Sequence, residues 1–133
     1  MREILFRGKR DKRFGAELWV YGVPFIDTNG DCIMKNSVSE RVVVPETVGQ
    51  FTGLTDKNDN KIFEGDIVRC KNYHGTVEGY IGYSKSAVWF LYCISGYSDE
   101  YLFNCADIEV IGNIHDNPEM LEEENQNEMC IMR

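Results

Sequence analysis

The amino-acid sequence predicts a mainly β protein in which an N-terminal β-hairpin region packs on a small SH3-like barrel. Strand-type runs rich in valine, isoleucine and aromatic residues recur along the chain, and turn residues separate them every ~8–12 positions. Helix signals occur in one place only. Asn117 can cap a helix, Pro118 suits its first position, and acidic residues follow as far as Glu124. We therefore expect one short C-terminal helix.

The N-terminal region contains short strands that depend on turns. Two apolar runs, residues 4–6 and 18–25, flank the charged segment 8–15 and predict a hairpin. Further along, residues 32–34 and 40–44 flank a polar loop and are expected to pair. Strands this short bury little apolar area. We therefore expect this region to fold against the rest of the chain rather than alone.

The second half has the strand order of a small barrel. An alternating strand follows Asp66, then a glycine-rich strand, a continuous apolar strand and two short strands. Gly79 and Gly82 are expected to let the glycine-rich strand bend, as a five-stranded barrel requires. The predicted organisation is an N-terminal β region at 1–50, a barrel at 51–122 and a frayed acidic tail at 123–133.

Composition and charge exclude several classes of protein. With 43% hydrophobic residues the chain is globular, and no apolar run approaches the ~18 residues of a membrane span. The first residues lack the apolar core of a secretory signal, so we expect a cytoplasmic protein with no membrane partner. A net charge of −8 makes general nucleic-acid binding unlikely, without excluding a local basic patch.

The cysteines predict neither a disulfide framework nor a zinc site. Their number is odd and no two are closer than twelve positions, whereas structural zinc sites use closely spaced pairs. We expect reduced thiols, several of them buried, and no bound metal or other cofactor. The five are Cys32, Cys70, Cys93, Cys105 and Cys130.

Aromatic residues in the second half give the strongest indication of a binding surface. They are too numerous for all of them to fill one small core, and tyrosine and tryptophan are enriched where proteins bind one another. Alternation along the strands must also place some of them away from the core. The alternative is that they serve only as core and strand formers. The residues predicted to bind are Tyr80, Tyr83, Trp89 and Tyr92.

A basic segment near the N-terminus provides the alternative function. Residues 1–13 hold six basic and two acidic side chains, a density that could contact a phosphate backbone. A solvated loop is the simpler interpretation. The nucleic-acid alternative uses Arg7, Lys9, Arg10, Lys12 and Arg13.

No catalytic constellation is visible, so we expect no enzyme. Glu64 and Asp66 lie at strand spacing on one side, but Glu-Gly-Asp is better explained as the turn that enters a strand. Asp56, Asn58 and Asn60 begin like a calcium loop, but its required glycine and glutamate are missing. Turn chemistry explains this segment too.

Four separated motifs resemble the YopX-like family of small phage and prophage proteins. They are Met1–Lys9 with Trp19–Gly22, Val44–Asn58, Ile62–Val68 and Glu109–Glu119. The resemblance implies an SH3-type barrel in the second half, a phage or prophage gene, and expression in a bacterial host cytoplasm. It implies no activity and carries over no catalytic residue.

One departure from the family pattern concerns a turn. The family usually has Asp-Lys-Asn-Gly, whereas Asp59 follows Asn58 here, so we expect Asn58 or Asn60 to adopt the positive φ. Together, the observations predict a small phage or prophage accessory protein that binds an unknown phage or host protein or a second copy of itself.

Overall fold

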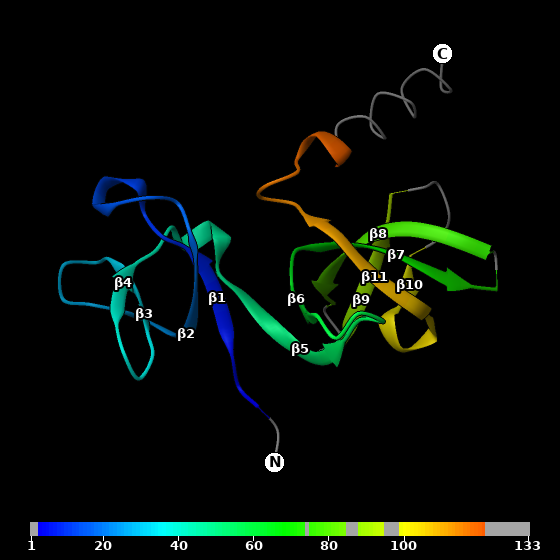
Figure 1. The fold of residues 1–133 in the computed structure, drawn as a ribbon, viewed down its shortest axis with the longest axis horizontal. Coiled ribbons are helices and arrows are strands. Elements are labelled where there is room, and N and C mark those ends of the chain that lie inside the picture. The colour runs from blue at the N-terminus through cyan, green and yellow to red at the C-terminus, as the bar shows by residue number, and fades with distance from the viewer. Residues whose placement is uncertain (1–2, 74, 85–87, 95–98, 122–133) are drawn as a thin grey trace. The chain divides into compact units, whose positions relative to one another are not determined.

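The computed structural model describes residues 3–73, 75–84, 88–94 and 99–121 (Figure 1). These residues form two antiparallel sheets and one helical turn at residues 119–121, which confirms the mainly β class and the short helix. The chain divides into two compact units, Met1–Gly53 and Leu54–Arg133. The predicted boundary after residue 50 lies within strand β5. Packing of the N-terminal region on the second unit stays a prediction.

The first sheet has the strand order β4-β3-β2-β1-β5-β6. The predicted hairpin is confirmed, since β1 pairs antiparallel with β2. The predicted pairing of residues 32–34 with 40–44 is also confirmed, with Ile33 opposite Val42. The strands are β1 (Phe6–Lys9), β2 (Trp19–Ile26), β3 (Cys32–Lys35), β4 (Glu40–Val42), β5 (Gly49–Thr55) and β6 (Lys61–Phe63), with 3-10 turns η1 (Lys12–Phe14) and η2 (Pro45–Thr47).

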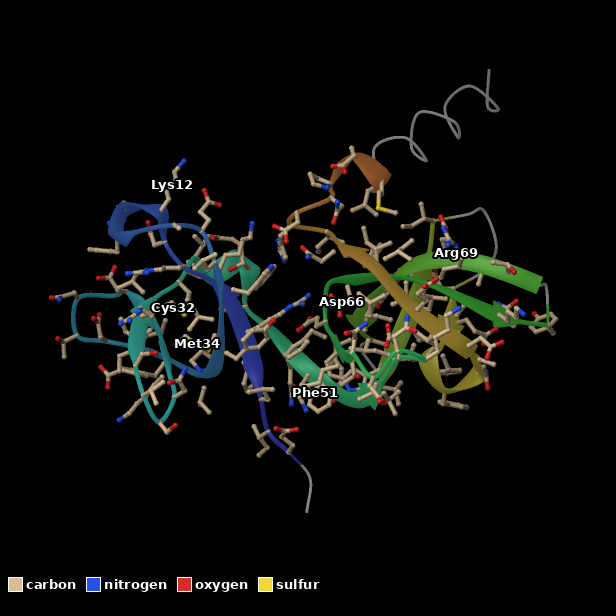
Figure 2. All side chains as sticks on the ribbon, viewed as in Figure 1. Lys12, Cys32, Met34, Phe51, Asp66 and Arg69 are labelled. Atoms are coloured by element: carbon tan, nitrogen blue, oxygen red, sulfur yellow. The ribbon has the colours of Figure 1, made fainter. Side chains whose placement is uncertain are left out.

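One face of the strands in the first unit forms a small core. Alternation places Met34 and Cys32 of β3 on that face, where they are buried together with Val43. Phe6 and Val20 from the β1–β2 hairpin pack against them. Figure 2 shows the side chains of Cys32 and Met34 among these strands. The core is small because the strands are short.

The second unit contains a five-stranded sheet with the order β10-β9-β8-β7-β11. Its core combines residues from every part of the unit: Ile62, Val68, Val77, Ile81 and Leu91 are buried in one cluster. The strands are β7 (Asp66–Asn72), β8 (Gly75–Tyr83), β9 (Trp89–Cys93), β10 (Glu100–Tyr101) and β11 (Ala106–Asn113), and the 3-10 turn η3 (Leu102–Asn104) follows β10.

The predicted barrel is not closed within the described residues. The two edges of the second sheet are β10 and β11, and no ladder joins them in that part of the chain. Two local features explain the open sheet. Strand β10 has only two residues, and Gly65, with φ of +90°, turns the chain between β6 and β7 so that β6 joins the other sheet.

The turn between β5 and β6 differs from the prediction. Asp59, and neither Asn58 nor Asn60, has the positive φ, at 66°. The Asp56 amide donates to the Asn60 carbonyl, and the Asp59 amide donates to the Asp56 carbonyl. A three-residue hairpin loop closed in this way needs a left-handed residue at its last position. That position is Asp59, where the family pattern has glycine.

We expect Asp59→Gly to stabilise the protein by about 0.5–1 kcal/mol. Glycine adopts positive φ without the steric cost that aspartate bears, although it also gains entropy in the unfolded chain. Asp59→Ala is the matched control and should be destabilising, because alanine has no side-chain oxygen to support the left-handed conformation. Urea unfolding midpoints of the three proteins measure both effects. A glycine variant no more stable than wild type would contradict this account.

The last described segment forms a polar turn before its helical residues. Asn117 was expected to cap the helix, but its side-chain oxygen accepts from the Asn113 amide at 3.2 Å. The Asn113 side-chain oxygen in turn accepts from the His115 and Asp116 amides. Asn117 therefore fastens β11 to the turn. The predicted acidic tail, residues 123–133, lies outside the described residues.

Candidate functional site

An aromatic row crosses three strands on the face of the second sheet opposite its core. Consecutive ring centroids lie 5.1–5.4 Å apart, with stacked rings at both ends of the series. This is the separation at which aromatic pairs attract one another. We call this surface the aromatic row; in spatial order it consists of Tyr80 on β8, Tyr92 and Phe90 on β9, Tyr101 on β10, and Phe103 on η3.

Strand alternation and register build the aromatic row. Ile81 and Leu91 are paired neighbours on β8 and β9, and both are buried in the core. The residues next to them in sequence must point to the other face. Tyr80 pairs with Tyr92, and Tyr101 pairs with Phe90, so the register brings these rings together across the strands.

A glycine makes room for the Tyr92 ring of the row. A Cβ atom built on Gly82 would lie 2.5 Å from Cε2 of Tyr92. The Tyr92 ring therefore lies over the bare backbone of β8, next to Tyr80. Gly79 has a different role, because a Cβ there would lie 2.6 Å from the Tyr92 carbonyl oxygen. Neither glycine has a positive φ, so both supply space rather than an unusual backbone angle.

The four residues predicted to bind separate into two pairs. Tyr80 and Tyr92 are stacked within the aromatic row. Tyr83 and Trp89 also contact each other edge to face, with ring centroids 4.7 Å apart. Strand alternation, however, places them on the same face of the sheet as the core residues Ile81 and Leu91. Trp89 packs against the core cluster. The structure therefore assigns Trp89 mainly to packing, while Tyr83 is half exposed at the end of β8.

Three members of the row, Phe90, Tyr101 and Phe103, are not among the residues that the sequence predicts to bind. Phe90 could have been found, because it has the same strand parity as Tyr92. Tyr101 and Phe103 come together through η3, which turns Phe103 back onto Tyr101. Strand alternation does not predict this contact. Phe103 is 73% exposed and Tyr101 is 42% exposed, so this end of the row is the most accessible.

Acidic side chains flank the aromatic row. The Asp99 carboxylate accepts from the Cys93 amide at 3.0 Å, and the Glu100 carboxylate accepts from Asn104 at 2.9 Å. Burial raises the pKa of Tyr80, and the neighbouring Tyr92 and Asp99 raise it further. The Tyr80 hydroxyl thus remains a neutral hydrogen-bond donor at physiological pH.

The five residues of the predicted basic loop do not form one basic surface. Arg7 and Lys9 lie on strand β1, because the strand continues through a segment that was expected to be loop. The Arg7 guanidinium lies 4.4 Å from the Trp19 ring, and the Lys9 amino group lies 5.7 Å from it. Lys9 and Trp19 are also paired across β1 and β2. These two cations therefore pack on the sheet.

The remaining basic residues occupy different surroundings. Arg13 pairs with Asp11 at 2.9 Å and lies 3.9 Å from Asp31. The hydrogen bond from Arg13 lowers the pKa of Asp11. The Arg10 side chain is half-buried, and its guanidinium lies next to Gly15. Lys12 extends from η1 as an exposed side chain (Figure 2).

The carboxylates that resembled cation or catalytic sites are turn anchors. Asp56 accepts from the amides of Asn58 and Asn60 at 2.9 Å and from that of Val110 at 3.0 Å. Asp66 is 1% exposed and accepts from the Phe63 amide at 2.7 Å. Both carboxylates thus make the backbone hydrogen bonds that the turn interpretation predicts.

The described part of the chain contains no group of three or more histidine, cysteine or acidic residues arranged to hold a metal. A hollow of about 110 Å³ lies beside β7 and β11, and ion-paired residues line it: Lys71 with Asp107 at 3.6 Å and Arg69 with Glu109 at 3.8 Å. None of the described helical residues belongs to a helix long and apolar enough to cross a membrane.

Comparison with known proteins identifies the family. No curated protein matches the sequence. A family model described as YopX protein matches residues 24–122, which is well over half of the chain and includes all strands from β3 to β11. The predicted resemblance is confirmed, and the chain belongs to the YopX family.

Proposed function

We propose that this protein is a phage- or prophage-encoded accessory protein that acts in the bacterial host cytoplasm as a protein-interaction module rather than as an enzyme. The aromatic row is the observation that carries the proposal. Five rings on one face contact one another in series and are not needed to fill the core, which other residues fill.

The chemistry of the row favours a protein partner. Large, rigid rings bury much area at low entropic cost, which is why tyrosine and other aromatic residues are frequent at binding hot spots. The row crosses β10, an edge strand that can accept another strand. Asp99 and Glu100 beside it favour a partner surface with apolar groups and basic neighbours. Either an unknown phage or host protein or a second copy of this chain fits that description.

The proposal includes an SH3-like form for the second unit, open between β10 and β11. Its support is the single core cluster, to which β6, β7, β8, β9, η3 and β11 all contribute. A flat five-stranded sheet could not bring side chains of the edge strand β11 into one cluster with those of η3, which follows the other edge strand. A strongly coiled sheet can do so, and it leaves the aromatic row on the outside.

The nucleic-acid alternative receives less support. Two of its five cations pack on Trp19, and Arg13 is paired with acidic side chains. The whole chain also carries a net charge of −8. Phosphate binding would require these cations to be redirected towards the ligand.

Site-specific photo-crosslinking tests the proposal. A photoreactive phenylalanine analogue replaces Phe103, in cells that carry the phage or prophage. The matched control replaces Tyr73, which is 82% exposed but lies outside the aromatic row. We expect a defined protein–protein crosslink, to itself or to one partner, from position 103 and not from position 73. Equal labelling from both positions would contradict the proposal, and a product lost on nuclease treatment would favour the alternative.

A further inference from the structure

The first unit also displays an aromatic ring on its surface, in the segment that contains η1. We call residues 12–18 the η1 loop, and every one of them is exposed. Phe14 is 52% exposed and Leu18 is 63% exposed. The Arg13 guanidinium lies 5.1 Å from the centroid of the Phe14 ring, and Lys12 extends away from the strands (Figure 2). The η1 loop thus presents apolar side chains together with cations.

Hydrogen bonds fasten both ends of the η1 loop. The Asp11 carboxylate accepts from the Arg13 amide at 2.9 Å, and the Asp11 carbonyl accepts from the Phe14 amide at 3.0 Å. At the other end, the Arg10 amide donates to the Leu18 carbonyl at 2.9 Å. Phe14 is therefore held in an exposed position before any partner arrives, which reduces the entropic cost of binding.

The η1 loop and the aromatic row carry opposite charges. Residues 9–18, the loop with its base, hold four basic and two acidic side chains. Residues 90–105 contain four of the five rings of the row, with two acidic side chains and no basic one. These two are the exposed Asp99 and the half-buried Glu100, and both accept hydrogen bonds from neutral groups. A basic, apolar loop is therefore complementary to this acidic, aromatic surface.

Charge also favours contact between unlike surfaces when two copies of the chain meet. Two aromatic rows placed face to face would bring the carboxylates of both copies together, and like charges at an interface are unfavourable. Two η1 loops would oppose their cations in the same way. A loop on a row avoids both repulsions and lets exposed rings pack against each other. The chain thus carries both halves of one complementary interface.

We propose that the protein associates with itself, the η1 loop of one copy binding the exposed end of the aromatic row of a second copy. Phe14 of the first copy packs against Phe103 and Tyr101 of the second, and Lys12 faces the Asp99 carboxylate. This inference rests on the proposed function, because it names a second copy as the partner of the row. Each copy keeps one free loop and one free row, so the contact is heterologous and builds chains or rings.

Mixing two variants of the full-length protein tests this arrangement. The loop variant, Lys12→Glu/Phe14→Ser, keeps the aromatic row, and the row variant, Tyr101→Ser/Phe103→Ser, keeps the η1 loop. In size-exclusion chromatography with light scattering, wild type should associate as its concentration rises, and each variant alone should associate at least about tenfold more weakly. An equimolar mixture should form a one-to-one dimer and nothing larger, because one intact loop then meets one intact row.

The mixture also serves as the folding control, since a rescued dimer requires both variants to be folded. The matched control Val38→Ser/Arg41→Glu changes one apolar and one basic side chain at exposed positions of the first unit outside the loop. It should associate like wild type. The inference is overturned if the loop variant associates as well as wild type, if the mixture stays monomeric, or if wild type is monomeric at about 1 mM.

Failure of this inference can be distinguished from failure of the proposed function. A monomeric wild type whose position 103 still crosslinks to one other protein in cells would overturn self-association and support the interaction module. Absence of any defined crosslinked product from position 103 would count against both.

Discussion

Replacing Asp56 by alanine should lower the free energy of unfolding by about 3 kcal/mol. Asp56 is 5% exposed, and its carboxylate accepts from two amides of its own turn and from the Val110 amide of β11. Each hydrogen bond to a charged acceptor contributes about 1.5–3 kcal/mol, and donors left without a partner add a penalty. Chemical denaturation measures the loss. A variant within about 1 kcal/mol of wild type would show that the carboxylate does not anchor this turn.

The same carboxylate should make stability depend on acid pH. Burial acts to raise the pKa of Asp56, but the hydrogen bonds from Val110, Asn60 and Asn58 outweigh it and hold the pKa below its ordinary value of 3.8. The stability from this depressed pKa is fully present well above pH 3.8 and is lost as the pH falls through the folded-state value. The stability difference between wild type and Asp56→Asn should therefore shrink below pH 3.8. A difference independent of pH would contradict the assignment.

Gly79→Ala should destabilise the protein by about 2–3 kcal/mol, whereas Gly82→Ala should cost less than about 1 kcal/mol. A methyl group at Gly79 would meet the Tyr92 carbonyl oxygen at 2.6 Å and the buried Leu91 side chain, neither of which moves easily. A methyl group at Gly82 would lie closest to the Tyr92 ring, which can swing away.

The two glycine variants are matched, because they make the same substitution on one strand. Thermal or urea unfolding ranks their stability. Near-ultraviolet circular dichroism should change for Gly82→Ala, as the Tyr92 ring leaves its position in the aromatic row. Equal destabilisation by both variants would contradict the different roles assigned to the two glycines.

Local signals in the sequence were enough to predict most strands and the places of their turns, although β1 continues into a segment that the sequence predicts as loop. The hairpin of β1 and β2 and the pairing of β3 with β4 follow from apolar runs separated by turn residues. The positive φ was predicted at Asn58 or Asn60 but occurs at Asp59, because loop length and hydrogen bonding, rather than residue preference, determine its position. Closure of a barrel depends on contacts between distant edges, and a two-residue β10 cannot supply them.

The candidate site was predictable in part for the same reason. Strand alternation predicts which residues of one strand share a face. Whether Tyr80 of β8 and Phe90 of β9 lie on the same face depends on the pairing of the two strands, which alternation within each strand does not determine. The contact between Tyr101 and Phe103 needs a 3-10 turn that has no strong sequence signal. The sequence alone does not reveal that Arg7 and Lys9 of the basic segment lie against the Trp19 ring.

The most direct test of the interaction proposal is the crosslink yield from position 103 in the double variant Phe90→Ser/Tyr101→Ser. These substitutions remove the middle of the aromatic row and leave the core residue Leu91 in place. The lost cross-strand aromatic pair should cost about 1 kcal/mol of stability, so the variant should stay folded. We predict that the crosslink falls at least about tenfold, as expected for the loss of a binding hot spot. An undiminished crosslink from the folded double variant would show that the protein does not bind through the aromatic row.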